Sequence, residues 1–335
     1  MASMRIDRRR ALQSVLAIAL LASAGALSQP AGKKARRIGV LLVTSRKRAD
    51  IHRLLVPFDQ ALRGFGYVEG RNLHIEWREA DGRLERLPAL AAELVAREVE
   101  LIVAGAGQAA VAARKATSTI PIVFVASIDP VGSGLVKNLA RPESNVTGFT
   151  TFGKEAARKQ LELLREVLPL ARRIAVVHSG GDMASDPLLE ELREASSLLA
   201  LQIQWYDVKG GVELERALGS IERDRPDGLH VLMTVATYLN RRRIVEYAAS
   251  LRLPAVYGFS EFVQVGGLVS YGFSYADNWR RTAAYVDRIL KGEKPRDLPV
   301  QQPESLELAV NLKAARALGV AIPQSVLLRA SQVIE

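Results

Sequence analysis

Short apolar runs alternate with amphipathic stretches along most of the chain, and this alternation restricts the folds open to it. The run at 37–45, RIGVLLVTS, has no polar alternation, and further strands are expected at 228–236 and 254–262. Continuous apolar runs are typical of strands that are covered on both faces of a parallel sheet. Helical stretches such as 84–99 and 154–169 separate the runs. This spacing predicts right-handed βαβ units and therefore an α/β fold with doubly wound parallel sheets.

The alternation is interrupted near residues 146–151 and again near residues 271–275. Because 335 residues exceed the usual size of one domain, two lobes are expected, with these two segments as chain crossings and hinge candidates. The predicted lobes comprise 36–150 with 272–300, and 151–271 with 301–335. Ligands of open α/β sheets bind outside the carboxyl ends of the strands, so the site is expected in a cleft between the lobes.

Residues 1–28 have the layout of an export signal. A basic start is followed by an apolar stretch from Val15 to Leu27 and by small residues up to Ser28. The arginines of Asp7–Gln13 also resemble the twin-arginine motif, with Ala11 where that motif prefers a large apolar residue. The expected location is the periplasm, reached by the twin-arginine or the general secretory route.

The amino-acid composition limits the partners that the protein can bind and the chemistry that it can carry out. The formal net charge of +10 falls to +7 without the first 28 residues, which hold four arginines and one aspartate. The remaining basic residues are interleaved with acids, which favours a solvated mixed surface over a nucleic-acid groove. The chain contains no cysteine, so thiol chemistry and thiolate metal sites are excluded. We expect no cofactor, no metal and a monomer.

Residues that follow the predicted strands are the candidates for ligand contact. They are small hydroxyls, glycines and aromatics with few charges, a set that suits binding better than bond breaking. No nucleophile elbow, metal set or acid/base pair is found, so no enzyme activity is expected. The candidate binding residues are Thr44, Ser45, Gly105, Gly107, Gln108, Ser127, Asp129, Ser179, Thr234, Tyr257 and Tyr271.

The segment 105–110, GAGQAA, ends a strand and opens a helix. It matches the dinucleotide fingerprint only in form, because no acid closes the next strand. Free N–H groups at a helix start attract anions, so a ligand carboxylate is one interpretation and a tight turn is another. Asp129 likewise has two interpretations: it either binds the ammonium group of a zwitterion or stabilises the Asp-Pro turn.

Seven of the chain's 19 aromatic residues fall within residues 257–279. Some must be core, but aromatic side chains at strand ends are also suitable walls for a ring-bearing ligand. Tyr257 and Tyr271 are the two that we expect to touch the ligand.

Several long segments carry a family resemblance. They include FGYVEGRNLHIEWREADGRLERLPALAAELV, ATSTIPIVFVASIDPVGSGLVKNLARPESNVTGFT and RRRIVEYAASLRLPAVYGFSEFVQVGGLVSYG. From Arg37 to Glu335 the chain resembles the ABC-transporter substrate-binding proteins grouped with tryptophan/tyrosine-type uptake components. The resemblance implies a type I periplasmic-binding-protein fold. As cleft positions it implies Thr44, Ser45, Gly105 to Gln108, Asp129, Tyr257 and Gly258. Relatives often have Gly-Thr-Pro where this chain has Gly105-Ala106-Gly107, which changes the polarity of the pocket.

The function implied by this resemblance is that of an extracytoplasmic receptor. It would close two lobes around a small solute, with an amino acid or an aromatic or organic carboxylate favoured, and deliver it to an ABC permease and ATPase complex. It would meet the membrane only through that permease. Two alternatives stay open from the sequence: a solute-binding feeder of a signalling receptor and an exported enzyme acting on a small carboxylate. No helix-turn-helix precedes Arg37, which argues against a transcription regulator.

Overall fold

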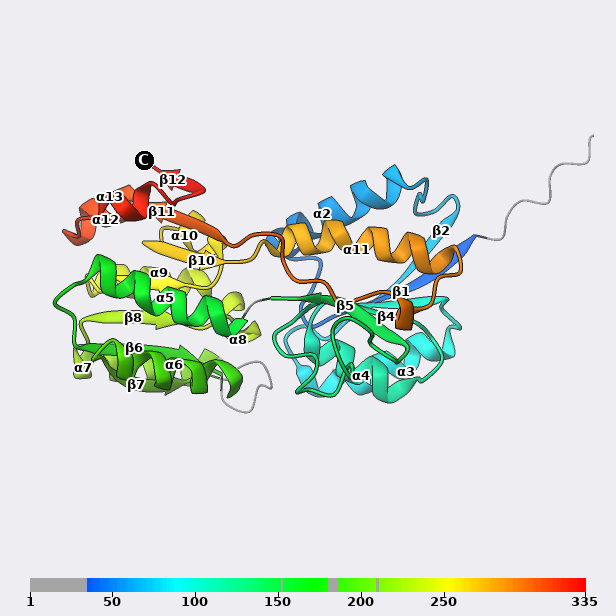
Figure 1. Ribbon diagram of the computed structural model, residues 1–335, viewed down its shortest axis with the longest axis horizontal. Coiled ribbons are helices and arrows are strands. Elements are labelled where there is room, and N and C mark those ends of the chain that lie inside the picture. Colours follow the sequence, from blue (N-terminus) through cyan, green and yellow to red (C-terminus); the bar gives the residue numbers. More distant parts are fainter. Residues whose placement is uncertain (1–34, 152, 180–185, 209–210) are drawn as a thin grey trace, which may run out of the picture. The chain divides into compact units, whose positions relative to one another are not determined.

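The computed structural model describes residues 35–151, 153–179, 186–208 and 211–335. The predicted export signal at 1–28 lies outside the described residues. Arg36–Glu335 form one compact unit, and this unit contains two sheets (Figure 1).

The first sheet has five parallel strands in the order β2-β1-β3-β4-β5. The strands are apolar and buried because helices cover both faces. One face is covered by α3 and α4, and the other by α2 together with α11, which packs along α2 although it comes from much later in the chain (Figure 1). The elements are β1 (Arg36–Leu42), α2 (Ala49–Gly64), β2 (Leu73–Glu79), η1 (Leu84–Arg86), α3 (Leu87–Ala96), β3 (Leu101–Ala104), α4 (Gly107–Ala116), β4 (Ile122–Ser127), β5 (Val146–Thr150), α11 (Tyr275–Leu290) and η2 (Pro295–Asp297).

The second sheet has seven strands in the order β12-β11-β10-β9-β8-β6-β7. Its pairs are parallel except β10 with β11, which is antiparallel. The elements are α5 (Gly153–Val167), β6 (Arg173–His178), α6 (Asp186–Leu198), β7 (Gln202–Asp207), α7 (Gly211–Asp224), β8 (Gly228–Val231), α8 (Val235–Leu239), α9 (Arg241–Ser250), β9 (Ala255–Tyr257), α10 (Ser260–Gln264), β10 (Val269–Gly272), β11 (Glu307–Asn311), α12 (Leu312–Leu318), α13 (Gln324–Leu327) and β12 (Gln332–Ile334).

Two strands predicted from the sequence are shorter than expected. The strand expected at 228–236 ends at Val231, because Thr234 and Thr237 form a capping box that starts α8. The strand expected at 254–262 ends at Tyr257, and α10 begins at Ser260. In both cases a short helix, α8 or α10, takes up the part of the sequence that was expected to continue the strand.

The chain passes between the sheets three times. The interrupted sequence pattern predicted the first two crossings as hinge candidates, and the predicted lobe bounds imply a third near residue 300. The first follows β5 at Thr151, and the second is Phe273–Ser274 between β10 and α11. The third, 302–306, leads into β11. It starts beside the first, because Thr150 donates a backbone hydrogen bond to the Gln301 carbonyl at 2.8 Å.

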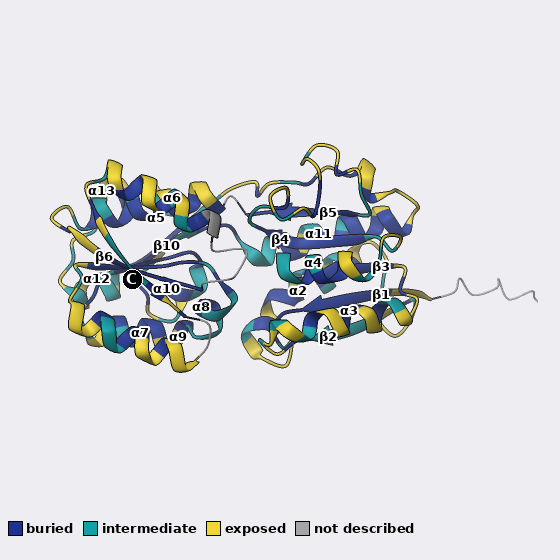
Figure 2. Ribbon diagram, turned by 90° about the horizontal axis from the view of Figure 1, so that it is seen from below, coloured by how far each residue is buried: buried dark blue, intermediate teal, exposed yellow. Residues whose placement is uncertain are grey.

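An apolar core joins the two sheets. One buried cluster contains Ile38 and Val40 of the first sheet, Val231 of the second, and Phe259 and Phe273 between them. Figure 2 shows the buried strands flanked by helices whose outer faces are exposed. The crossings are therefore packed among large side chains, and this packing positions the site.

Candidate ligand-binding site

A cavity of about 140 Å³ lies between the carboxyl ends of the first sheet and the loops of the second. Thr44, Gly107 and Ser127 line it from the first sheet, and Met233 and Thr234 line it from the second. A cavity of roughly 150 Å³ accommodates one benzene ring, so this pocket suits a small organic molecule.

The start of α4 forms part of the pocket wall. Ala106, Gly107 and Gln108 line the pocket, and Ala106 makes no side-chain capping hydrogen bond to the helix. A Cβ at Gly107 would lie 3.3 Å from the Ser127 hydroxyl oxygen, so glycine allows the helix start to approach the end of β4. Backbone N–H groups of a first turn are suited to a carboxylate.

Asp129 lines the same pocket and also holds its own turn. Its Oδ1 accepts a hydrogen bond from the Gly132 backbone N–H at 2.8 Å. A Cβ at Gly132 would lie 2.3 Å from Asp129 Oδ2, so only glycine permits this approach. The turn role is therefore seen directly, and binding of a ligand ammonium group stays a prediction.

Three hydroxyl groups at the pocket have no hydrogen-bond partner. They belong to Ser133, Thr151 and Tyr238, and all three oxygens are buried. Most buried polar groups in proteins are paired, because an unpaired group loses its hydration without compensation. A ligand in this pocket would supply the partners.

Aromatic side chains form a further part of the pocket wall. Phe259 lies edge-on to Tyr238 and to Phe273, with ring centroids 5.3 and 5.8 Å apart. Tyr275 continues the wall, and its hydroxyl donates to the Gly105 carbonyl. The other apolar lining residues are Val43, Ile51, Val111, Ala126, Ile128, Met233 and Val235.

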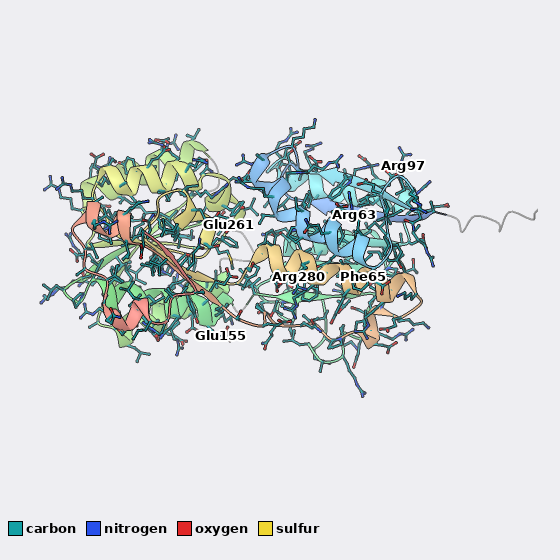
Figure 3. The ribbon with its side chains drawn as sticks, turned by 90° about the horizontal axis from the view of Figure 1, so that it is seen from above. Arg63, Phe65, Arg97, Glu155, Glu261 and Arg280 are labelled. Carbon is teal, nitrogen blue, oxygen red and sulfur yellow. The ribbon has the colours of Figure 1, made fainter. Side chains whose placement is uncertain are left out.

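A buried ion pair joins the two lobes beside the pocket. Arg241 Nη2 of α9 lies 2.6 Å from Asp50 Oδ2 of α2, and the side chains are only 7% and 12% exposed. Burial by itself raises the pKa of Asp50, but hydrogen bonds from Arg241 and Arg48 outweigh it and hold this pKa below its usual range. Nearby, burial raises the pKa of the Glu261 carboxyl in the first turn of α10 (Figure 3).

The structure brings together six of the residues predicted from the sequence. All six lie at the end of a strand or the start of a helix. Their contact with a ligand stays a prediction. They are Thr44, Gly107, Gln108, Ser127, Asp129 and Thr234.

Two other predicted residues lie near the pocket without lining it. Ser45 donates its hydroxyl to Glu79 Oε2 at 2.8 Å, on the rim of the first lobe. Gly105 presents its carbonyl to Tyr275, and a Cβ there would meet Leu42 at 3.1 Å. Of the two, Gly105 contacts the wall directly, through Tyr275.

The remaining predicted residues lie in the second lobe away from the lining. Tyr257 is 1% exposed and stacks on Phe262 with ring centroids 4.7 Å apart. Gly258 packs against Met233, and Tyr271 packs on a core cluster while its carbonyl accepts from Gln160. Ser179 is buried after β6 and is not among the lining residues.

Sequence reasoning missed Ser133 and Tyr238 and treated Thr151 only as a hinge residue. It placed Tyr275 both in a hinge segment and in the aromatic cluster at 257–279. Ser133 lies in the same turn as Asp129, so the loop itself was a usable signal. Tyr238 follows the Thr234–Thr237 pair on a short helix, and its approach to the pocket depends on α9 and α2.

The described residues offer little for other chemistry. They contain no group of three or more His, Asp or Glu side chains placed to hold a metal ion. His230 is fully buried, contacts Gln160 at 2.7 Å, and has its pKa lowered by burial to about 3, so it remains neutral. Within the same part of the chain, no helix has the length and apolar character needed to cross a membrane.

The fold and the pocket define a two-lobed solute-binding protein of the type I periplasmic-binding class. The chain belongs to the ABC transporter substrate binding protein family, whose model matches residues 52–334. This confirms the family and the fold class expected from the sequence.

Three relatives are similar over most of the chain. A tyrosine-binding protein of Clostridioides difficile (strain R20291) is 25% identical over 85% of this chain and 81% of its own. An ABC domain from Streptococcus pneumonia in complex with L-Trp is 28% identical with a TM-score of 0.80, covering 89% of this chain and all of that one. A conserved domain protein from Vibrio cholerae is 29% identical with a TM-score of 0.82. The match covers 90% of this chain and all of that one.

Proposed function

We propose that this protein captures an amino acid with an aromatic or large apolar side chain and acts purely by binding. The three unpartnered hydroxyls of Ser133, Thr151 and Tyr238 in one pocket are the observation that carries this proposal. They indicate a polar ligand, and the aromatic wall indicates that part of the ligand is apolar.

The zwitterionic part of the ligand has matching groups in the pocket. The first turn of α4 offers backbone N–H groups for a carboxylate, and Asp129 offers a carboxylate for an ammonium group. The names of two relatives point the same way, because one binds tyrosine and another was solved with L-Trp.

The transport role follows from family membership. We infer that the protein works in the periplasm, closes its two lobes about the three crossings when solute binds, and delivers the solute to an ABC permease and ATPase complex. The ligand favours the closed state by contacts that it makes to both lobes at once, since the pocket is lined from both.

A thermal-shift screen of residues 29–335 tests the ligand class. The panel comprises L-amino acids, aromatic carboxylates, sugars and purines. A ligand that binds only the folded state adds about 2.7 kcal/mol at a hundredfold excess over its Kd, so the expected result is a raised melting temperature with aromatic amino acids. A shift with sugars or purines alone would contradict the proposal and leave the receptor fold in place.

A further inference from the structure

Tyr238 is a pocket residue whose polar group is buried and unused. The residue is 8% exposed, lines the cavity, and its hydroxyl has no hydrogen-bond partner. By contrast, the Tyr275 hydroxyl in the same wall already donates to a carbonyl.

The Tyr238 ring is held in place from several sides. The Arg241 guanidinium lies 4.6 Å from the ring centroid and donates to the Tyr238 carbonyl at 2.9 Å. Phe259 contacts the ring edge-on, and the capping box of Thr234 and Thr237 fixes the start of α8. Because the ring cannot easily turn away, its hydroxyl presents a fixed polar group to any bound solute.

This hydroxyl and the zwitterion-binding groups come from different lobes. Tyr238 lies on α8 of the second lobe, whereas the first turn of α4 and Asp129 follow β3 and β4 of the first sheet. A solute whose carboxylate and ammonium groups face the first lobe therefore turns its side chain toward the second lobe, where Tyr238 and Phe259 line the pocket.

We propose that Tyr238 is a specificity-determining residue that hydrogen-bonds a polar group on the far end of the bound amino acid side chain. This rests on the proposed function. The pocket would then select aromatic amino acids that carry a donor or acceptor on the ring over those with a plain hydrocarbon ring. An analogue that lacks this group leaves the Tyr238 hydroxyl buried and unpaired, and sites of that kind discriminate strongly.

The test compares L-tyrosine with L-phenylalanine, which differ only in the ring hydroxyl, on the wild type and on Tyr238→Phe. We expect calorimetric titration to show that the wild type prefers tyrosine by about tenfold or more. In Tyr238→Phe tyrosine affinity should fall by about tenfold, with phenylalanine affinity unchanged or higher, so the preference is lost.

Tyr247→Phe is the matched control. Tyr247 also has an arginine, Arg243, over its ring at 5.4 Å, but its hydroxyl bonds the Leu218 carbonyl and Glu222 outside the pocket. The tyrosine-to-phenylalanine ratio should stay at the wild-type value in this variant, which separates a specific effect from a general loss of packing.

The outcomes separate this inference from the proposed function. Equal ratios in the wild type and Tyr238→Phe would overturn the inference alone, and so would a wild type that binds neither probe but binds an amino acid with a large hydrocarbon side chain, such as leucine. A wild type that binds no amino acid with an aromatic or large apolar side chain overturns the proposed function together with the inference.

Discussion

Asp129 shows how one side chain can serve both a turn and a pocket. Its carboxylate accepts a hydrogen bond from the Gly132 backbone N–H, and glycine is the only residue type that fits against the carboxylate at this position. The same carboxylate belongs to the pocket lining. Because a carboxylate has several acceptor positions, a ligand ammonium group can be added without breaking the turn.

Asp129→Asn separates these roles, since asparagine keeps an acceptor oxygen for Gly132 but loses the charge and replaces the second carboxylate oxygen with an NH2 donor. We expect a loss in affinity for an aromatic amino acid of about tenfold or more, the usual scale for a charge-assisted hydrogen bond. Calorimetry with L-tyrosine and with its analogue lacking the amino group gives the measurement. Unchanged affinity for the amino acid would show that Asp129 serves the turn alone.

At the scale of elements, α2 and α9 are linked by the Arg241–Asp50 pair across 191 positions of the sequence. The pair is buried, and Arg241 in turn holds Tyr238. Removing one partner of a buried pair leaves the other charge without compensation. We therefore expect the lobe contact and the pocket wall to be energetically coupled.

We expect Asp50→Asn to weaken solute binding by about tenfold, mainly through faster release, because the closed arrangement loses a charge-assisted contact. Stopped-flow fluorescence of solute release measures this. Asp59→Asn on the same helix is the control. Its partner Arg63, labelled in Figure 3, is exposed on the last turn of α2, and exposed pairs contribute little. Equal release rates for the two variants would contradict the coupling.

At the scale of the whole molecule, we expect any hinge motion to occur at the three crossings. Thr151, Phe273–Ser274 and 302–306 lie outside helices and strands, so backbone rotation there leaves both sheets intact. Thr151 and Phe273 also line the pocket. A ligand that contacts them touches the hinge directly.

Small-angle X-ray scattering checks closure. The radius of gyration of residues 29–335 should decrease when a saturating ligand from the thermal screen is added, because we expect the ligand to favour the state in which it contacts both lobes. A solute from the panel that gives no thermal shift is the control and should leave the curve unchanged. Identical curves with and without the true ligand would argue against closure.

Tyr257 and Tyr238 show how far the sequence pattern can predict which side chains reach the pocket. Tyr257 is the last residue of β9 and ends an apolar run, so it was a predicted contact, whereas Tyr238 lies on α8, after β8. In the structure Tyr257 stacks on Phe262 inside the core, because α10 folds back over the end of β9. Tyr238 reaches the pocket because Arg241 and Phe259 hold it there.

By itself the sequence determined the alternation of strands and helices, the two-lobed α/β fold and the polar residues at strand ends, because periodicity and turn chemistry are local properties. Only the tertiary structure decided the strand order, the approach of the third crossing to the first and the set of residues that share the pocket. Those features depend on contacts between distant segments, such as Asp50 with Arg241 and Tyr275 with Gly105, which no local pattern records.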